Sequence, residues 1–201
     1  AGGVPRVLPI ARDDRQTLRD TFAEALRADV VVSSGGVSVG EFDYVREVLH
    51  ELSVVEEFSR VAMKPGKPLT FSRLEPTRPG EKRRLLFGLP GNPASSMVSF
   101  ELFVRPALRR LQGHKETGRP RILVRLETPV APDRSRLHFA RARVRCDGES
   151  GTFFATAPQR QGSGMLRSMV GVNALLHVPP GPAPLIAGTT VWATLFGAVY
   201  A

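Results

Sequence analysis

Two glycine-rich segments of this chain have the composition of anion-binding turns. Residues 33–44 read SSGGVSVGEFDY and follow an apolar run, and residues 88–96 read GLPGNPASS and follow another. A glycine turn between a strand and a helix presents free backbone N–H groups and the positive end of the helix dipole, which bind phosphate and similar oxyanions. The two turns predict a site for a multiply charged anionic ligand. Its candidate residues are Gly35, Gly36, Ser38, Gly91 and Asn92.

Charged residues follow other strand-like runs. Lys64 and Lys67 lie in the segment KPGKP, where prolines restrict the backbone. Asp43 closes the first glycine segment, and Asp13 follows the apolar run that ends at Ile10. Carboxylates beside an anion are unfavourable unless a divalent cation lies between them. The set therefore predicts Mg²⁺ held by Asp13 and Asp43, and phosphoryl or nucleotidyl chemistry. Simpler readings stay open, namely a plain tight turn, a helix cap at Asp13 and solvated lysines.

The elements that must position these residues alternate between strand and helix up to residue 115. Apolar runs at 4–8, 30–33, 54–63, 69–71 and 85–87 predict strands. Apolar residues at helical spacing predict a helix through 18–26, with Asp13 and Asp14 at its N-cap, and helices over 44–52 and 93–111. We expect an α/β domain over residues 1–115 with a doubly wound, mostly parallel sheet. In such a sheet the ligand lies outside the carboxyl ends of the strands, where both glycine turns and the KPGKP loop would meet.

From residue 118 to 201 the pattern changes to short strands separated by turn residues. The runs at 122–126, 137–144, 152–157, 175–178 and 191–195 predict a small antiparallel β-barrel or sandwich. The chain thus reads as an α/β domain followed by a small all-β barrel domain.

The composition excludes several classes of function. The chain has 201 residues and one cysteine, Cys146, which rules out an internal disulfide framework and a multi-thiolate metal site. No apolar run is long enough to span a membrane, and a cytoplasmic location is expected. The net charge is +9, but the C-terminal arginines alternate with apolar residues as solvent-facing strand positions do. We therefore expect no nucleic acid. The histidines, His138 among them, have no catalytic partner pattern.

Four motifs occur in an order that resembles the MoeA family of molybdopterin molybdenumtransferases, which includes the gephyrin E domain. They are SGGVSVGEFDY (34–44), MKPGKP (63–68), GLPGNPAS (88–95) and GSGMLRSM (162–169). The resemblance implies that adenylylated molybdopterin binds with a divalent metal, that molybdate is inserted at the dithiolene and that AMP is released. It also implies a homodimer. Members carry further N-terminal domains, so this chain is expected to be a C-terminal part of a longer enzyme.

The resemblance also assigns roles to residues. Asp13 and Asp43 match acidic active-site positions, and Lys64 and Lys67 match a lysine pair. Further matches are Pro90 and Ser95 of the second turn, Arg60 where the family often has lysine, and Ser163, Arg136 and Arg141 of the barrel.

The resemblance places the oxyanion among Lys64, Lys67, the turn at residues 90–95 and Ser163, beneath an arginine of the barrel. Ser163 can reach this place only if the barrel folds back over the sheet edge or if a dimer completes the site. Two other functions stay open. One is the related adenylyltransferase, which uses molybdopterin and ATP. The other is a non-catalytic, gephyrin-like scaffold with an apolar groove for a peptide.

Overall fold

A four-stranded sheet organises the first half of the chain in the computed structural model, which describes residues 1–35 and 44–199. Its strands, in spatial order, are β1 (Val30–Ser34), β5 (Arg84–Leu89), β4 (Thr70–Leu74) and β2 (Val55–Ser59). Strands β1 and β5 are parallel, whereas β5–β4 and β4–β2 are antiparallel. The expected mostly parallel sheet is therefore wrong for the described strands. The segments 60–69 and 75–83 are too short for the helical crossover that parallel neighbours require.

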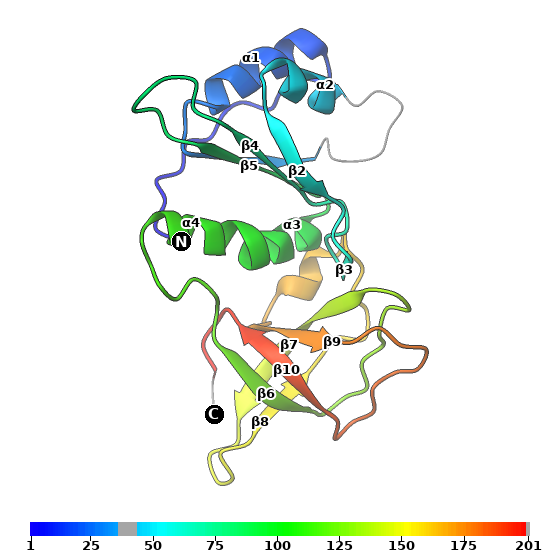
Figure 1. Ribbon diagram of the computed structural model, residues 1–201. Helices are drawn as coiled ribbons and strands as arrows, with labels where there is room; N and C mark the ends of the chain where they lie inside the picture. The colour runs from blue at the N-terminus through cyan, green and yellow to red at the C-terminus, as the bar shows by residue number, and fades with distance from the viewer. Residues whose placement is uncertain (36–43, 200–201) are drawn as a thin grey trace.

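Helices cover both faces of this sheet (Figure 1). Helices α1 (Arg15–Ala25) and α2 (Tyr44–Glu51) lie on one face. On the other face α3 (Pro93–Ser99), the π-helical segment η1 (Phe100–Val104) and α4 (Arg105–Leu111) form one continuous helix. Neighbouring residues of β5 show the two faces, because Leu86 packs with the α1–α2 core and Phe87 with the η1 core. The layers are therefore helix, sheet and helix.

The chain before α1 is extended but does not form the expected strand over residues 4–8. Val4, Val7 and Ile10 are each more than nine-tenths exposed. A strand needs a partner for its backbone N–H and C=O groups, and in the described structure this segment pairs with none. Asp14 is the N-cap of α1, since its carboxylate accepts from the backbone N–H of Thr17 at 2.8 Å. Asp13 therefore does not have the capping role and lies exposed before the helix.

Five strands of the second half close into a barrel. They are β6 (Arg121–Leu126), β7 (Leu137–Cys146), β8 (Phe153–Thr156), β9 (Ala174–Val178) and β10 (Thr190–Leu195). The order β7-β8-β6-β10-β9 returns to β7 through the β7–β9 pairing, so the sheet has no open edge there. Of the five pairs only β6–β8 is parallel, which corrects the purely antiparallel expectation. The core is narrow and rich in alanine, with Ala140, Ala142, Ala155 and Ala174 all fully buried.

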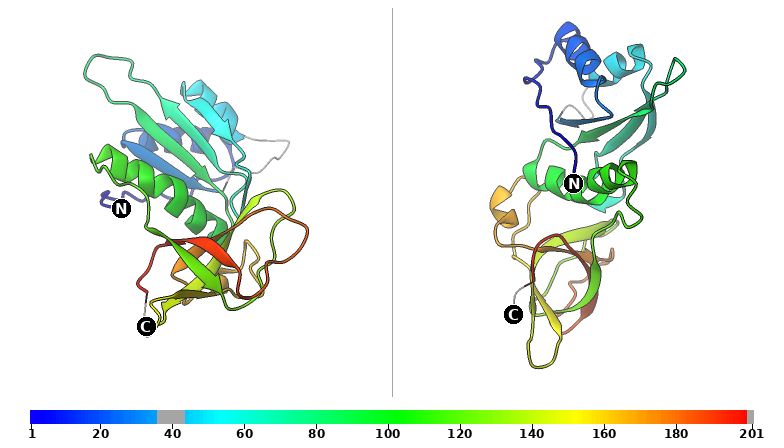
Figure 2. Two further views of the ribbon diagram at one scale, coloured as in Figure 1. Left: turned by 60° about the horizontal axis from the view of Figure 1, so that its bottom comes forward. Right: turned by 90° about the vertical axis from the view of Figure 1, so that its left-hand side faces the viewer.

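The α/β half and the barrel lie against each other (Figure 2), and a hydrophobic cluster and a short strand join them. Met63, Val98 of α3 and Leu175 of β9 are buried together where the helix formed by α3, η1 and α4 meets the barrel. Strand β3 (Met63–Lys64) leaves the first half and pairs with β7, in parallel, with Lys64 beside His138. The 3₁₀ turn η2 (Leu166–Met169) contributes Met169, which helps line a pocket shared with α3. None of the helices in residues 1–35 and 44–199 is long and apolar enough to cross a membrane.

Candidate functional site

Gly35 and Gly91 lie close together because they follow neighbouring parallel strands. Ser34 of β1 is in register with Leu89 of β5, and the N–H of Gly35 donates to Leu89 O at 3.1 Å. A Cβ placed on Gly91 would lie 3.6 Å from the Cα of Gly35. Gly35 also has a φ of +89°, which favours glycine. The structure therefore brings Gly35 and Gly91 together at one end of the sheet. Gly36, Ser38 and Asp43 lie outside the described residues.

The second turn is held by the start of α3 and by the barrel. Pro93 occupies the first helical position after Asn92, which is typical of a helix start. The Asn92 side chain does not cap this helix. Its amide instead donates to Ser163 Oγ at 3.2 Å, and Gly164 lies against Asn92 Oδ1. Of the two ways in which Ser163 could reach this turn, the Asn92–Ser163 contact is therefore made by the barrel of the same chain.

Other residues of this turn are inside the molecule. Pro90 and Ser95 are buried, and the Ser96 hydroxyl donates to Pro90 O. These contacts fix the backbone of the turn, while Gly91, Asn92 and Ser163 stay exposed. The exposed members are those available to a ligand.

The lysine segment is fastened to both halves of the molecule. Sequence reasoning treats residues 64–68 as a loop, whereas Lys64 belongs to β3 because β7 offers its edge there. On the other side the Val61 N–H donates to Lys67 O at 2.9 Å. Gly66 has a φ of +109° and packs closely on Met63 and Ser99. Lys64 is partly exposed and Lys67 exposed, so both ammonium groups can face a ligand.

A buried arginine lies beneath the segment that contains Ser163. Arg141 is fully buried, and its Nη2 donates to Gly162 O at 3.4 Å. Its Nε and Nη1 have no partner among the described residues. Burial lowers the pKa of Arg141, because the charged form is poorly solvated there. A buried guanidinium with unused N–H groups favours a nearby anion or ordered water.

A second arginine and a carboxylate face Lys64. Arg136 donates through Nε and Nη2 to the two oxygens of Asp133, at 3.2 and 2.8 Å. Lys64 Nζ lies 3.7 Å from Asp133 Oδ2. Sequence reasoning missed Asp133, although an aspartate two residues before a serine is a known turn signal.

His138 was also missed as a member of this group. It is buried, its Nδ1 lies 2.9 Å from Ala131 O, and its Nε2 has no partner among the described residues. Burial, and then the charges of Lys64 and Arg141, hold its pKa below the usual value, so it stays neutral. The only sequence signal is its position between the two arginines at 136 and 141.

Two expected site residues lie apart from these contacts. Arg60 is exposed, has a φ of +62° and donates its N–H to Leu69 O at 3.0 Å. Asp13 is exposed before α1. Within residues 1–35 and 44–199, no three His, Cys, Asp or Glu side chains group as a metal site would need.

The contacts form one continuous path. It runs from Gly35 and Gly91 to Asn92, through the barrel segment at residues 162–163, to Arg141. Lys64 reaches the same barrel strand through β3. The fold is therefore an α/β domain followed by a barrel, and its glycine residues and barrel cations are groups of the kind that suit an anion.

Comparison with known proteins identifies the family. Residues 1–110 match the model described as a probable molybdopterin binding domain, and residues 124–196 match the MoeA C-terminal region, domain IV. The chain is 37% identical to gephyrin of Dictyostelium discoideum over 94% of this chain and 29% of that protein. It is 35% identical to the molybdopterin molybdenumtransferase of a Nostoc strain, over 94% of this chain and 43% of that protein.

Solved structures agree with this assignment. The molybdopterin biosynthesis MoeA protein of Pyrococcus horikoshii matches with a TM-score of 0.71 and 28% identity, over 94% of this chain and 42% of that one. The chain belongs to the MoeA/gephyrin family. It spans less than half the length of these relatives.

Proposed function

We propose that this chain serves in molybdenum cofactor biosynthesis as part of a molybdopterin molybdenumtransferase, which inserts molybdate into adenylylated molybdopterin and releases AMP. The supporting observation is the continuous path from the paired glycine turns, through the Asn92–Ser163 hydrogen bond, to the buried Arg141. Two relatives with about 35% identity are named molybdopterin molybdenumtransferases, which supports the same reaction here.

Each group has a distinct task in this proposal. The glycine turns bind phosphate oxygens of the adenylylated substrate through backbone N–H groups. Lys64, Lys67 and Arg136 hold the molybdate oxyanion, with Ser163 as a hydroxyl donor and Arg141 as buried positive charge. Catalysis rests on positioning and electrostatics, because the two reactants are both anions and repel each other unless fixed cations lie between them.

Magnesium is proposed here on the family resemblance, because Asp13 lies apart from the contacts described above and Asp43 lies outside the described residues. Asp13 offers an exposed carboxylate, and Mg²⁺ commonly takes one or two carboxylates while ligand phosphates and water complete its shell. Asp13 and Asp43 would hold the ion, which would neutralise phosphate charge. We expect Asp43→Ala to lower molybdate-dependent AMP release by much more than threefold; a smaller effect, below ~0.7 kcal/mol in barrier, contradicts this metal role.

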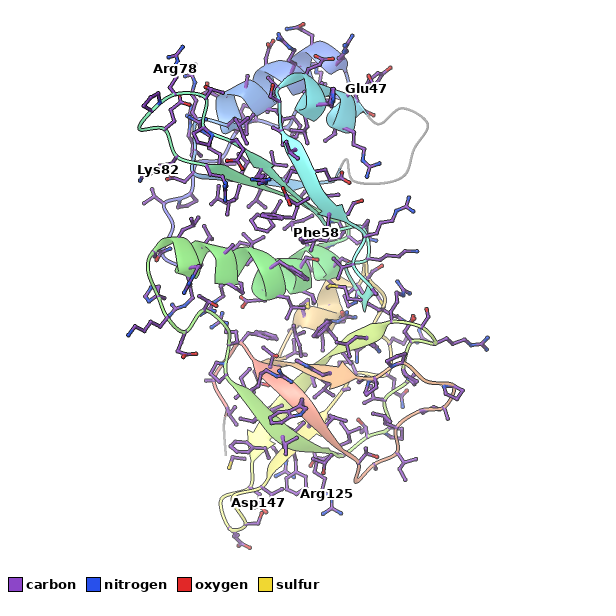
Figure 3. All side chains as sticks on the ribbon, in the orientation of Figure 1. Glu47, Phe58, Arg78, Lys82, Arg125 and Asp147 are labelled. Carbon is purple, nitrogen blue, oxygen red and sulfur yellow. The ribbon has the colours of Figure 1, made fainter. Side chains whose placement is uncertain are left out.

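Oxyanion binding gives the direct test. Calorimetric titration of the chain with sodium molybdate and sodium sulfate should show a saturable site, because the two anions share charge and shape. Lys64→Met should weaken binding about tenfold, or ~1.4 kcal/mol. Lys82→Met is the matched control, since Lys82 is an exposed lysine of the β4–β5 turn, away from the barrel (Figure 3). Equal effects of the two substitutions would contradict the site, and ATP consumption without molybdate would favour the adenylyltransferase.

One observation favours a scaffold function as a second candidate. An apolar pocket of about 320 Å³ lies between the α3–η1 helix and the barrel. It is lined by Leu89, Met97, Phe100, Met169, Leu175 and Phe196, among others. A pocket lined by methionine and aromatic side chains, with Met97 exposed, suits an apolar peptide. Calorimetry with apolar peptides, in wild type and in Met97→Glu, tests this function independently of the oxyanion site.

The homodimer and the cytoplasmic location stay predictions. Sedimentation equilibrium of the purified protein over a concentration series tests the first, and cell fractionation tests the second.

A further inference from the structure

The carboxylate of Asp133 contacts two of the side chains that are proposed to bind the oxyanion, Lys64 and Arg136. Its Oδ1 accepts from the backbone N–H groups of Ser135 and Arg136, at 3.2 and 3.1 Å, and from Arg136 Nε. Its Oδ2 accepts from Arg136 Nη2 and lies 3.7 Å from Lys64 Nζ. The Asp133 side chain is only 12% exposed, less than either cation. The contact therefore ties the barrel loop to β3 from the α/β half.

The donors held by Asp133 are those that an oxyanion needs. The Nε–Nη2 edge of a guanidinium is one of its bidentate edges, and it matches carboxylate and tetrahedral oxyanions alike. Lys64 is the second cation within reach of the same oxygen. Among the described residues, the charged and titratable groups near this carboxylate are Lys64 of β3, Arg134 and Arg136 of the preceding loop, and His138 of β7, with Arg141 farther along the same strand and close to His138. Burial keeps His138 neutral near pH 7, so the positive charges around Asp133 outnumber its single negative charge.

Asp133 stays ionised at all working pH values. The hydrogen bonds from the Arg136 guanidinium hold the pKa of its carboxyl well below the usual range. Protonation therefore does not release the two cations near neutral pH.

We propose that Asp133 is a positioning residue that acts as the internal counterion of the oxyanion site, holding Lys64 and Arg136 in place and setting which anions displace it. This inference rests on the proposed function. A dianion that displaces the Asp133 carboxylate interacts more favourably with Lys64 and Arg136, because it brings two negative charges in place of one. A monoanion replaces one negative charge by another and gains nothing. Asp133 thus lowers the affinity for every anion and excludes monovalent ones.

Asp133→Asn separates this role from a structural one. The amide oxygen can still accept from the Ser135 and Arg136 backbone N–H groups, while the loss of charge releases Lys64 and Arg136. We expect molybdate and sulfate to bind about tenfold more tightly at low salt, an effect that added salt reduces. We also expect nitrate to compete with molybdate in Asp133→Asn and not in wild type. Damage to the fold would weaken binding rather than strengthen it.

Asp147→Asn is the matched control, because it removes the same charge from a similar turn. Asp147 accepts from the Glu149 N–H and from the Ser150 hydroxyl. It follows the far end of β7, at the tip of the barrel (Figure 3). A strand of this length separates the two aspartates by ~30 Å. Molybdate affinity should change less than twofold. Asp133→Ser is also neutral and keeps an oxygen acceptor, so it should tighten binding as Asp133→Asn does. It provides the same test if the Asp133→Asn protein does not fold.

The outcomes separate this inference from the function on which it rests. Tighter binding and nitrate competition in the Asp133 variants alone support the counterion role. Unchanged or weaker binding in both Asp133 variants, with Lys64→Met still weakening it, overturns the counterion role only. If neither wild type nor the Asp133 variants bind molybdate or sulfate, both the oxyanion site and this inference are wrong.

Discussion

Gly66→Ala should loosen the lysine segment on which the proposed site depends. Gly66 lies between the two lysines and has a φ of +109°, a conformation that residues with a Cβ rarely adopt. A Cβ would lie 2.5 Å from Met63 Cε and 2.8 Å from Ser99 Oγ. Met63 and Ser99 are both buried, so neither neighbour can move away freely.

The expected magnitude combines two costs. The unfavourable φ costs roughly 1–3 kcal/mol, and overpacking of a filled interior costs roughly 1–3 kcal/mol more. A total of about 2–6 kcal/mol corresponds to a fall in melting temperature of roughly 4–24 °C for a chain of this size. Differential scanning calorimetry measures it. Molybdate affinity should fall as well, because β3 carries Lys64 to the barrel.

Two other glycines separate the costs. Gly80 has a φ of +87°, and a Cβ there would meet no atom within 4 Å, so Gly80→Ala incurs only the backbone cost. Gly118 has open space and no positive φ, so Gly118→Ala should be neutral or slightly stabilising. If Gly66→Ala destabilises no more than Gly80→Ala, close packing on Ser99 does not hold the lysine segment and the reasoning is refuted.

Two further predictions concern the barrel. Asn173→Ala should destabilise the barrel by about 2–4 kcal/mol, because the buried amide hydrogen-bonds Val144 N, Val144 O and Ala198 O, and truncation leaves these groups without that partner. Urea unfolding measures the loss. A loss smaller than that of Asn92→Ala, which truncates an exposed asparagine, would contradict the prediction. His177 has a pKa lowered to about 4 by burial, so the unfolded chain takes up its proton first as pH falls. The stability that His177 contributes is present above about pH 6.5 and is lost progressively towards pH 4. In thermal melts from pH 7.5 to 4, the His177→Gln protein should therefore lose less stability than wild type. If stability falls with pH in parallel for the two proteins, His177 is not the cause.

The positions of the turns and helices were predictable from the sequence because they depend on local chemistry. Glycine after an apolar run, as at Gly35, permits a left-handed turn, and proline after Asn92 marks a helix start wherever the segment lies in the fold. The alternation along β7 likewise predicted a strand with one face in the barrel core. The solvent-facing position expected for the alternating arginines holds for Arg143 and Arg145 but is wrong for Arg141, whose side chain is fully buried.

The direction of β4 and β2 could have been inferred but was not. Parallel strands need a crossover of a dozen or more residues, and the connecting segments at 60–69 and 75–83 are shorter. The strand expected at residues 4–8 does not form for a different reason. A strand needs an extended backbone and also a neighbouring strand whose free N–H and C=O groups pair with it, and the sequence pattern indicates only the first.

The family resemblance grouped Lys64, the turn at residues 90–95 and Ser163 in one site, but only the tertiary structure decided the contacts that hold them there. Nothing local in the sequence indicates that Asn92 donates to Ser163, that Lys64 pairs with β7 or that Asp133 faces two cations. These contacts depend on how the barrel docks on α3, through buried surface from Met63, Val98 and Leu175. Hydrophobic docking is non-directional, so the sequence specifies that these side chains are buried but not which polar groups their burial brings together.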